Sequence, residues 1–283
     1  IIISSIMKVF INISIVWLIK ALSFIVEINL FFGPVMNAAA GIANQAGNVI
    51  NHFSGNFQTA LNPQIVKNFA KEDFAAMNQL VFRASKFSFF LMLIFSVPLF
   101  LEAPLLLDIW LKKVPEHSVN FLRIGLFVSM FMALRNPLVT AANATGKVRK
   151  HASVVVSILL TIMPISYVVL KLGGIPESAS FVILFVTIVA TFASAYILSK
   201  MIHLNFKDFV NQVMYKVFLV TLVSFALPSL IFYILDEGLV RLIILSATST
   251  VSTCFAVLFI GFSYSERIFV IGMIKSKLGL NKK

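Results

Sequence analysis

The chain has 283 residues, of which 59% are hydrophobic and only 12% are charged, and 29 of them are phenylalanine. Soluble domains average about 45–50% apolar and about 25% charged residues, so this composition excludes a water-soluble domain and favours a lipid bilayer as the solvent. The formal net charge is +12, but the basic residues lie in short gaps between apolar runs, which argues against a nucleic-acid partner. The single cysteine, Cys254, excludes an internal disulfide framework and a cysteine-based zinc site.

Clusters of Pro, Gly and charged residues divide the chain into eight apolar units, each about as long as the ~20 residues a membrane-spanning helix needs. Helices are required because a lipid-exposed backbone must satisfy its own N–H and C=O groups, and no alternating barrel pattern is present. The predicted fold is therefore an all-α polytopic membrane protein. Its predicted spans cover residues 9–32, 37–66, 87–107, 119–141, 154–170, 179–198, 217–235 and 239–262.

The connections between these spans alternate in their content of Lys and Arg. Those near residues 67–86, 147–150 and 200–216, together with the C-terminal tail, hold most of the basic residues. The positive-inside rule predicts that these regions are cytoplasmic, which places both ends of the chain inside and requires an even number of spans. Segments 68–83 and 206–216 mix apolar and basic residues, so they are expected either as helices along the cytoplasmic interface or as plain polar linkers.

The chain begins at Ile1, within an apolar stretch that has neither a basic region nor a small-residue cleavage site before it. We expect it to be a fragment of a longer protein that does not transport on its own. An upstream reading frame in phase with it, encoding six more spans, would test this expectation.

The first predicted span carries Lys20 and, two turns further on, Glu27. An unpaired ammonium in the middle of a span is costly, so Lys20 needs a partner or a water-filled cavity. Three interpretations stay open: a phosphate-binding cation in a cavity, which we favour, an ion pair with another segment, and a side chain that extends to the interface. Glu27 lies nearer the outer end and is a candidate cation or proton site, with a solvated charge at the helix end as the alternative.

The second predicted span carries more side-chain amides than a membrane anchor needs. On a helix with 3.6 residues per turn, one polar stripe is formed by Asn37, Gly41, Asn44, Asn48, Asn51, His52, Gly55, Thr59 and Asn62. Polar side chains at this depth normally face a protein interior or a water-filled cavity. The stripe therefore predicts either a tight helix–helix seam or the lining of a solvated pathway, and the number of amides favours the pathway.

Side-chain amides and histidine can both donate and accept hydrogen bonds, which suits the hydroxyl groups of sugars. The predicted substrate-binding residues are Lys20, Asn37, Asn44, Gln45, Asn48, Asn51 and His52. In the fourth span, Pro137 permits a bend, and Arg135 is expected to reach the inner headgroups or, alternatively, an anionic substrate in the cavity. Glu27 and Arg135 are thus candidates for coupling or for binding an anionic substrate.

Several chemistries have no motif in this sequence. Gly146-Lys147 lacks the upstream glycine and the following Ser or Thr of a nucleotide-binding loop. The four histidines fall in separate segments, so no metal site is predicted, and neither a nucleophile elbow nor a paired-carboxylate cleft is present. The sequence therefore predicts a protein that is not an enzyme and that uses no cofactor.

Four stretches of the chain carry a family resemblance. They are Trp17–Lys20, Asn29–Ala39 continuing to Ala43, Ala60–Ile65 and Leu107–Pro115. They resemble the polysaccharide and O-antigen flippases of the multidrug/oligosaccharidyl-lipid/polysaccharide exporter superfamily. The resemblance is specific over the first seventy residues, recurs around residue 110 and is only compositional after about residue 150.

The resemblance implies two lobes of six helices that face each other across a central cavity, with two added helices. This chain would supply the second lobe (1–200), a cytoplasmic amphipathic linker (201–216), the appended helix pair (217–262) and a basic cytoplasmic tail (263–283). The implied cargo is an undecaprenyl-diphosphate-linked oligosaccharide, moved across the bacterial inner membrane by alternating access. Membrane lipids, a proton or Na⁺ as coupling ion, and polysaccharide polymerase or ligase machinery are the implied partners.

Two alternatives are kept beside this interpretation. A cation-coupled multidrug antiporter of the same superfamily would need acidic residues in its cavity, and only Glu27 and Glu102 lie near the membrane, against Lys20. A membrane-embedded glycosyltransferase or ligase would need large outer loops with Asp, Glu and His chemistry, and the outer connections of this chain are short.

Overall fold

The computed structural model describes residues 24–111, 113–263 and 266–268, and its regular elements are all helical. Residues 24–32 form a helix ahead of α2. The elements that follow are α2 (Pro34–Ala70), α3 (Phe74–Leu101), α4 (Ala103–Trp110), α5 (Ser118–Ala144), α6 (Val148–Leu160), α7 (Ile162–Lys171), α8 (Ser178–Met201), α9 (Phe206–Phe209), the π-helical η1 (Val210–Met214), α10 (Tyr215–Ile234), α11 (Leu239–Ala256) and the π-helical η2 (Val257–Gly261). The predicted all-α fold is confirmed.

Six helices in the described part are long and apolar enough to cross a membrane, and they correspond to the third to eighth predicted spans. They are Phe74–Leu101, Ser118–Ala144, Val148–Lys171, Ser178–Met201, Phe206–Ile234 and Leu239–Gly261. Most of the first predicted span, including Lys20, falls outside the described residues. The second span corresponds to α2, whose 37 residues measure about 55 Å along the axis but whose amides lower its hydropathy.

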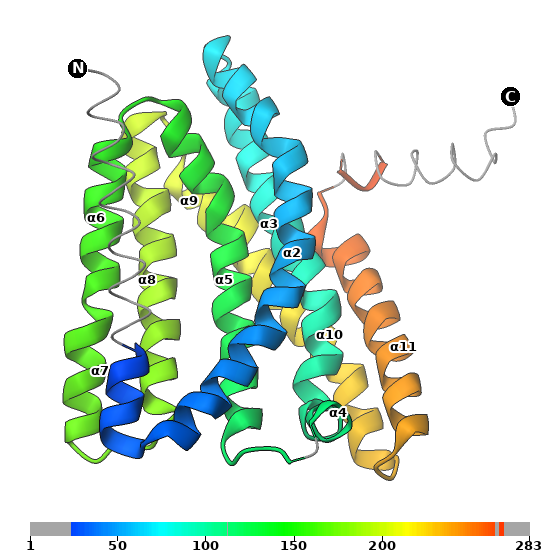
Figure 1. Ribbon diagram of the computed structural model, residues 1–283. Helices are drawn as coiled ribbons and strands as arrows, with labels where there is room; N and C mark the ends of the chain where they lie inside the picture. Colours follow the sequence, from blue (N-terminus) through cyan, green and yellow to red (C-terminus); the bar gives the residue numbers. More distant parts are fainter. Residues whose placement is uncertain (1–23, 112, 264–265, 269–283) are drawn as a thin grey trace, which may run out of the picture.

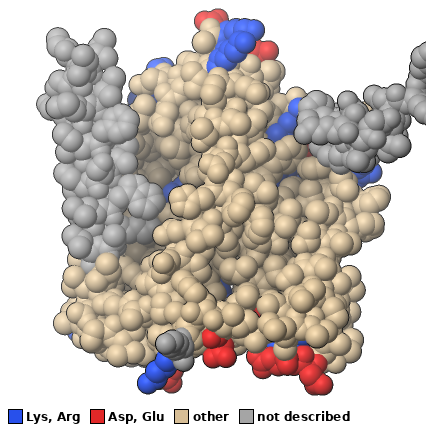
Figure 2. Space-filling view, turned by 45° about the vertical axis from the view of Figure 1, so that its right-hand side comes forward, with Lys and Arg blue, Asp and Glu red and all other residues tan. Residues whose placement is uncertain are grey.

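The helices form one bundle with α5 at its centre, packed against α2, α3 and α8. In Figure 1, α6, α7 and α8 stand on one side of α5, whereas α3, α10 and α11 stand on the other. The connections that precede α3, α6 and α9 lie at one end of the bundle, and those that precede α8 and α11 lie at the opposite end. A band almost free of charged side chains separates these two ends in Figure 2, as expected for the hydrocarbon region of a membrane.

The third predicted span ends earlier than expected, at Leu101 rather than Leu107, and α4 follows as a separate short helix. Pro104 has no N–H to donate to the carbonyl of Phe100, one turn earlier, so the helix cannot continue regularly. The freed Phe100 oxygen instead accepts a hydrogen bond of 2.9 Å from Nε of Arg123 on α5. Arg123 also stacks its guanidinium over the Phe100 ring, at 5.3 Å from the centroid.

Two segments expected at the cytoplasmic interface belong to long helices instead. Residues 68–83 form the last turn of α2, a tight reversal and the first turns of α3. The reversal is made by Glu72, which has a positive φ of 59°, and by Asp73, whose side chain caps α3 by accepting from the N–H of Ala76 at 2.9 Å. Residues 206–216 are also helical and continue directly into α10, in one helix from Phe206 to Ile234.

The fifth predicted span is interrupted within one helical stretch. α6 ends at Leu160 and α7 begins at Ile162, with Thr161 between them. Pro164 cannot donate to the carbonyl of Leu160, which accounts for the break at this point. The two helices pack together against α8, so the interruption leaves the span in place.

Two buried ion pairs fasten the hairpin of α10 and α11 to α3, one near each end of the bundle. At one end, the fully buried carboxylate of Glu102 accepts hydrogen bonds from Nε and Nη2 of Arg241, at 2.7 and 2.9 Å. At the other end, Lys86 donates to both oxygens of Glu266, at 3.1 and 2.9 Å, and Arg83 lies 3.3 Å from the same carboxylate. α3 thus contributes a carboxylate at one end and cations at the other.

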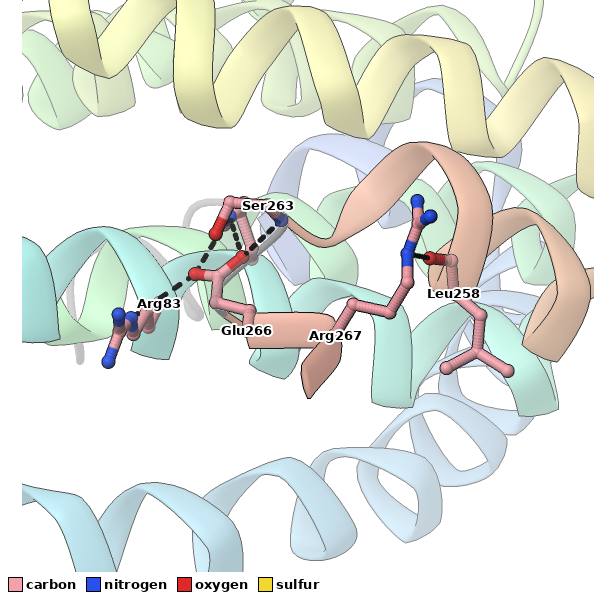
Figure 3. A network of polar contacts seen from close by, with 6 residues as sticks. Arg83, Leu258, Ser263, Glu266 and Arg267 are labelled. Carbon is pink, nitrogen blue, oxygen red and sulfur yellow. Dashed lines mark hydrogen bonds and ion pairs between the residues drawn. The ribbon is translucent and has the colours of Figure 1, made fainter. Parts of the chain in front are cut away.

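Glu266 lies just beyond the last span, in a compact set of polar contacts (Figure 3). The N–H of Ser263 donates to its carboxylate at 2.8 Å. Burial alone would raise the pKa of Glu266, but the hydrogen bonds from Ser263 and from Lys86 outweigh burial, and the pKa lies below its usual range. The neighbouring Arg267 points away from Glu266 and donates from Nε to the carbonyl of Leu258 at 2.8 Å. It thereby satisfies a backbone acceptor of η2.

Glu102→Gln should lower the unfolding free energy by about 1–3 kcal/mol, because it weakens the charge-assisted hydrogen bonds that Arg241 donates to this position. The double substitution Glu102→Leu with Arg241→Met should recover most of this loss, since it removes both charges together. Thermal unfolding in detergent would measure both effects, with the exposed Asp108→Asn as the control. A double variant as unstable as Glu102→Gln would contradict this account of the pair.

At the same end of the bundle, Glu177 joins the start of α8 to the start of α5. Its carboxylate lies 2.6 Å from Nδ1 of His117 and accepts a hydrogen bond of 2.8 Å from Asn120. Burial alone would raise the pKa of Glu177, but the hydrogen bonds from Asn120 and His117 outweigh it and hold the pKa below its ordinary value of 4.5.

Because this pKa is depressed in the folded protein, the Glu177 carboxylate adds stability above about pH 4.5, and this stability is lost as the pH falls through the lower folded value. Glu177→Gln should therefore lower the melting temperature at pH 7 and flatten its decline between pH 5 and pH 3. Melting curves at several pH values would test this, with the exposed neighbour Glu116→Gln as the control. Identical acid profiles for wild type and Glu177→Gln would refute the linkage.

Candidate substrate cavity

A cavity of about 260 Å³ opens between α2, α5 and α8. Its polar lining consists of the amides Asn44, Asn48 and Asn51 from α2, together with Ser129 from α5 and Ser180 from α8. The remaining wall is apolar and is formed by Phe24, Ala40, Ala43, Gly47, Phe121, Gly125, Val128, Met132 and Ile183. The cavity thus joins hydrogen-bonding groups from three helices and has no charged residue in its described lining.

The spacing of residues along α2 positions the three amides. Asn44, Asn48 and Asn51 follow one another at steps of four and three, so they share a face of the helix. Ala43 and Gly47 are buried beside them, and a Cβ atom at Gly47 would lie 3.5 Å from the hydroxyl of Ser129. These small residues let α2 approach α5 closely, and the amides at the edge of the contact face the space that is left.

Beyond the cavity, α2 and α5 form a polar seam in which three contacts share one offset. Asn51 donates to Ser129 at 3.2 Å, Asn136 donates to Gln58 at 3.1 Å, and Thr140 donates to Asn62 at 3.1 Å. Each contact joins residues 78 positions apart, so the two helices run parallel in a constant register. Both interpretations of the amide-rich helix therefore apply, with the cavity along its first half and the seam along its second.

Gln58 is the centre of this seam, and it is buried with 6% of its surface exposed. Its Nε2 group donates to the hydroxyl of Ser88 on α3 at 2.9 Å and to the carbonyl of Ala133 on α5 at 2.8 Å. That carbonyl is free because Pro137, one turn later, has no N–H to donate. Sequence reasoning did not select Gln58, although its place seven residues after Asn51 and the proline in α5 together could have indicated it.

Three of the seven predicted substrate-binding residues, Asn44, Asn48 and Asn51, line the cavity. Asn37 does not, because its amide donates to the backbone carbonyl of Ile25 at 3.0 Å and ties α2 to the preceding helix. Gln45 and His52 are exposed on the surface of α2 outside the described lining. Lys20 lies outside the described residues, so its role stays a prediction. The lining serines on α5 and α8 were not predicted.

Glu27 and Arg135 are both buried, with 4% and 5% of their surfaces exposed. The hydroxyl of Ser166 on α7 donates to one carboxylate oxygen of Glu27, and the other oxygen has no partner among the described residues. Glu27 is therefore not the solvated helix-end charge considered as an alternative. Arg135 does not belong to the described lining of the cavity, and its side chain is enclosed by the bundle.

The family model MatE matches residues 9–168 of the chain. The chain belongs to the MatE family. MatE proteins are transporters of the multidrug/oligosaccharidyl-lipid/polysaccharide exporter superfamily rather than enzymes, so the resemblance is confirmed at the level of the superfamily. No curated protein and no solved structure matches the chain.

The MatE match covers the first predicted span and the elements from α2 to most of α7, so it includes the amides of the cavity and Ser129. Ser180 on α8 and the hairpin of α10 and α11 lie beyond it. This MatE chain is therefore a multi-pass membrane transporter, and its amide-rich helix α2 lines an open cavity.

The cavity can be tested by cysteine accessibility, in the whole protein and in a Cys254→Ser background that removes the native exposed thiol. Asn44→Cys and Asn48→Cys should react with a water-soluble, membrane-impermeant thiol reagent, because their side chains face the cavity. Val49→Cys, on the exposed apolar face, and Ser54→Cys, which is buried, are the matched controls and should stay unmodified. If the cavity positions were as unreactive as these controls, the proposed water-filled cavity would be wrong.

Proposed function

We propose that this chain is part of a flippase that moves undecaprenyl-diphosphate-linked oligosaccharide repeat units across the bacterial inner membrane, for O-antigen or polysaccharide biosynthesis. The observation that carries the proposal is the lining of the cavity, where three amides and two hydroxyls converge without a charged residue. Amides and hydroxyls donate and accept hydrogen bonds, as sugar hydroxyls require. The surrounding apolar wall is typical of sites that enclose a ligand and orient it with a few polar groups.

The mechanism follows from the properties of such a cargo. A sugar diphosphate cannot cross about 30 Å of hydrocarbon unaided, so the protein must provide a polar path while the prenyl chain stays in lipid. Rocking of one lobe against another would expose this path to the two sides in turn. In this scheme Lys20 binds the diphosphate, and a proton or Na⁺ at Glu27 couples the motion to a gradient.

A cation-coupled multidrug antiporter is the second candidate, and Glu27 is the observation that favours it. The buried carboxylate has an oxygen without a partner in the described part of the chain, as a site for a cation or a proton requires. The same residue also serves the coupling step of the flippase. The absence of acidic residues from the described lining of the cavity supports the oligosaccharide cargo over a cationic one.

We further propose that both ends of the chain are cytoplasmic. Most basic residues of the described connections lie at one end of the bundle, around Lys71, Lys147 and Lys207, whereas the other end holds Glu116, Asp236 and Glu237 together with Lys113. The positive-inside rule assigns the first end to the cytoplasm. The division into a transport lobe (1–200), a linker (201–216), an appended pair (217–262) and a tail (263–283) belongs to the same proposal.

The two candidates can be separated by complementation with the whole protein. In a strain that lacks its O-antigen flippase, the wild type should restore long-chain lipopolysaccharide on gels. The double substitution Asn44→Leu with Asn48→Leu should reduce the amount of restored long-chain lipopolysaccharide at least tenfold. The loss of two hydrogen bonds to the cargo lowers its binding free energy by roughly 1–3 kcal/mol or more. The control Asn56→Leu, on the exposed surface of α2, should leave the amount of restored lipopolysaccharide unchanged.

The same variants should be assayed for drug resistance in a strain that lacks its multidrug antiporters. Resistance that depends on Glu27 and is unaffected by the two leucines, with no restoration of lipopolysaccharide, would replace the flippase by the antiporter.

A further inference from the structure

A buried guanidinium without a counter-charge lies inside the bundle, away from the lining of the cavity. Arg135 of α5 has 5% of its surface exposed, and its Nε and Nη1 groups have no hydrogen-bond acceptor. His151 of α6 is 3% exposed, its Nε2 atom also has no partner, and it lies close enough to interact electrostatically with Arg135. Two neighbouring helices, α5 and α6, thus each carry a buried nitrogen-bearing side chain with unsatisfied hydrogen-bonding groups.

No carboxylate of the chain neutralises this cation. The sequence contains eleven acidic residues, and every one of them lies in the described part of the chain. The ion pairs in that part join carboxylates to Arg83, Lys86, His117 and Arg241, and none of them involves Arg135. A buried charge without a partner costs several kcal/mol, so the fold calls for a negative group that the polypeptide does not supply.

We infer that Arg135 and His151 bind a small inorganic anion, such as chloride or phosphate, between α5 and α6. Arg135 would supply the charge and charge-assisted hydrogen bonds, and His151 would donate from Nε2. The exposed Lys147, Arg149 and Lys150 surround the adjacent connection and raise the local concentration of anions. The inference goes beyond the proposed function and does not rest on it, since neither residue lines the cavity.

The enclosure of the site decides which kind of anion it can take. Lys and Arg side chains that bind lipid phosphates extend to the interface and keep their charged ends exposed. Arg135 and His151 are almost completely buried, so a headgroup that carries two acyl chains cannot reach them, whereas a single small ion can. Bound there, the ion would hold the inner half of α5 to the start of α6, between which few other contacts exist.

The test compares melting temperatures of the purified whole protein in potassium chloride, potassium phosphate and potassium gluconate at equal ionic strength. Chloride or phosphate should raise the melting temperature by about 5 °C over gluconate, saturating with concentration, because a ligand that binds only the folded state stabilises it by mass action. Arg135→Gln should abolish the difference. Arg149→Gln, an exposed arginine near the same helix end, should keep it.

If Arg135→Gln does not fold, Arg135→Lys replaces it in the test, because it keeps the positive charge. This variant should need at least a tenfold higher anion concentration for half of the rise in melting temperature. In crystals grown with bromide, an anomalous peak within hydrogen-bond distance of Arg135 would support the inference directly. Equal melting temperatures in all three salts would overturn it, as would an undiminished response in Arg135→Gln. A response to phosphatidylglycerol micelles alone would also overturn it, because the anion would then be a lipid headgroup.

Discussion

The scarcity of water inside a membrane is the constraint on which this bundle depends, because a polar group that loses its partner within a helix is best satisfied by another helix. Pro137 frees the carbonyl of Ala133, which accepts from Gln58 of α2, and Pro104 frees that of Phe100, which accepts from Arg123. Each substitute bond joins two helices that would otherwise meet only through apolar packing. Pro104 and Pro137 thus interrupt the hydrogen bonding of their own segments and also create the acceptors through which α5 binds its neighbours.

The same constraint explains how the helices beyond the matched family region are attached. α10 and α11 meet α3 mainly through apolar side chains, which lipid would solvate equally well. Lipid cannot replace the pairs of Glu102 with Arg241 and of Lys86 with Glu266, because Glu102, Lys86 and Glu266 are buried in the protein near the ends of the bundle and a buried charge needs a partner. α3 therefore connects the hairpin of α10 and α11 to α5 and to the other helices that line the cavity.

The sequence was informative where a property repeats along one helix. Apolar length gave the spans, and the three-four spacing of Asn44, Asn48 and Asn51 gave the polar lining, since both patterns lie within a single segment. It was silent where a partner comes from another helix. Nothing near Arg135 in the sequence shows that its side chain is buried, and nothing near Gln58 indicates that Ser88 and Ala133 are its acceptors. The break after Leu101 follows from Pro104, which the sequence does contain, but the partner of Glu102 at this break is Arg241, 139 residues away, and no local pattern indicates it.

The constant offset between α2 and α5 has a mechanical consequence. A shift of one helix along the other by a single residue would break the contacts of Asn51, Gln58 and Asn62 together. Sliding by less than a full step therefore forms no new hydrogen bond in exchange. α2 and α5 are therefore expected to move together as one rigid unit. A hinge for their motion must then lie outside α2 and α5. Gly33, directly before α2, is such a position, because its φ of 81° is accessible to glycine and to few other residues.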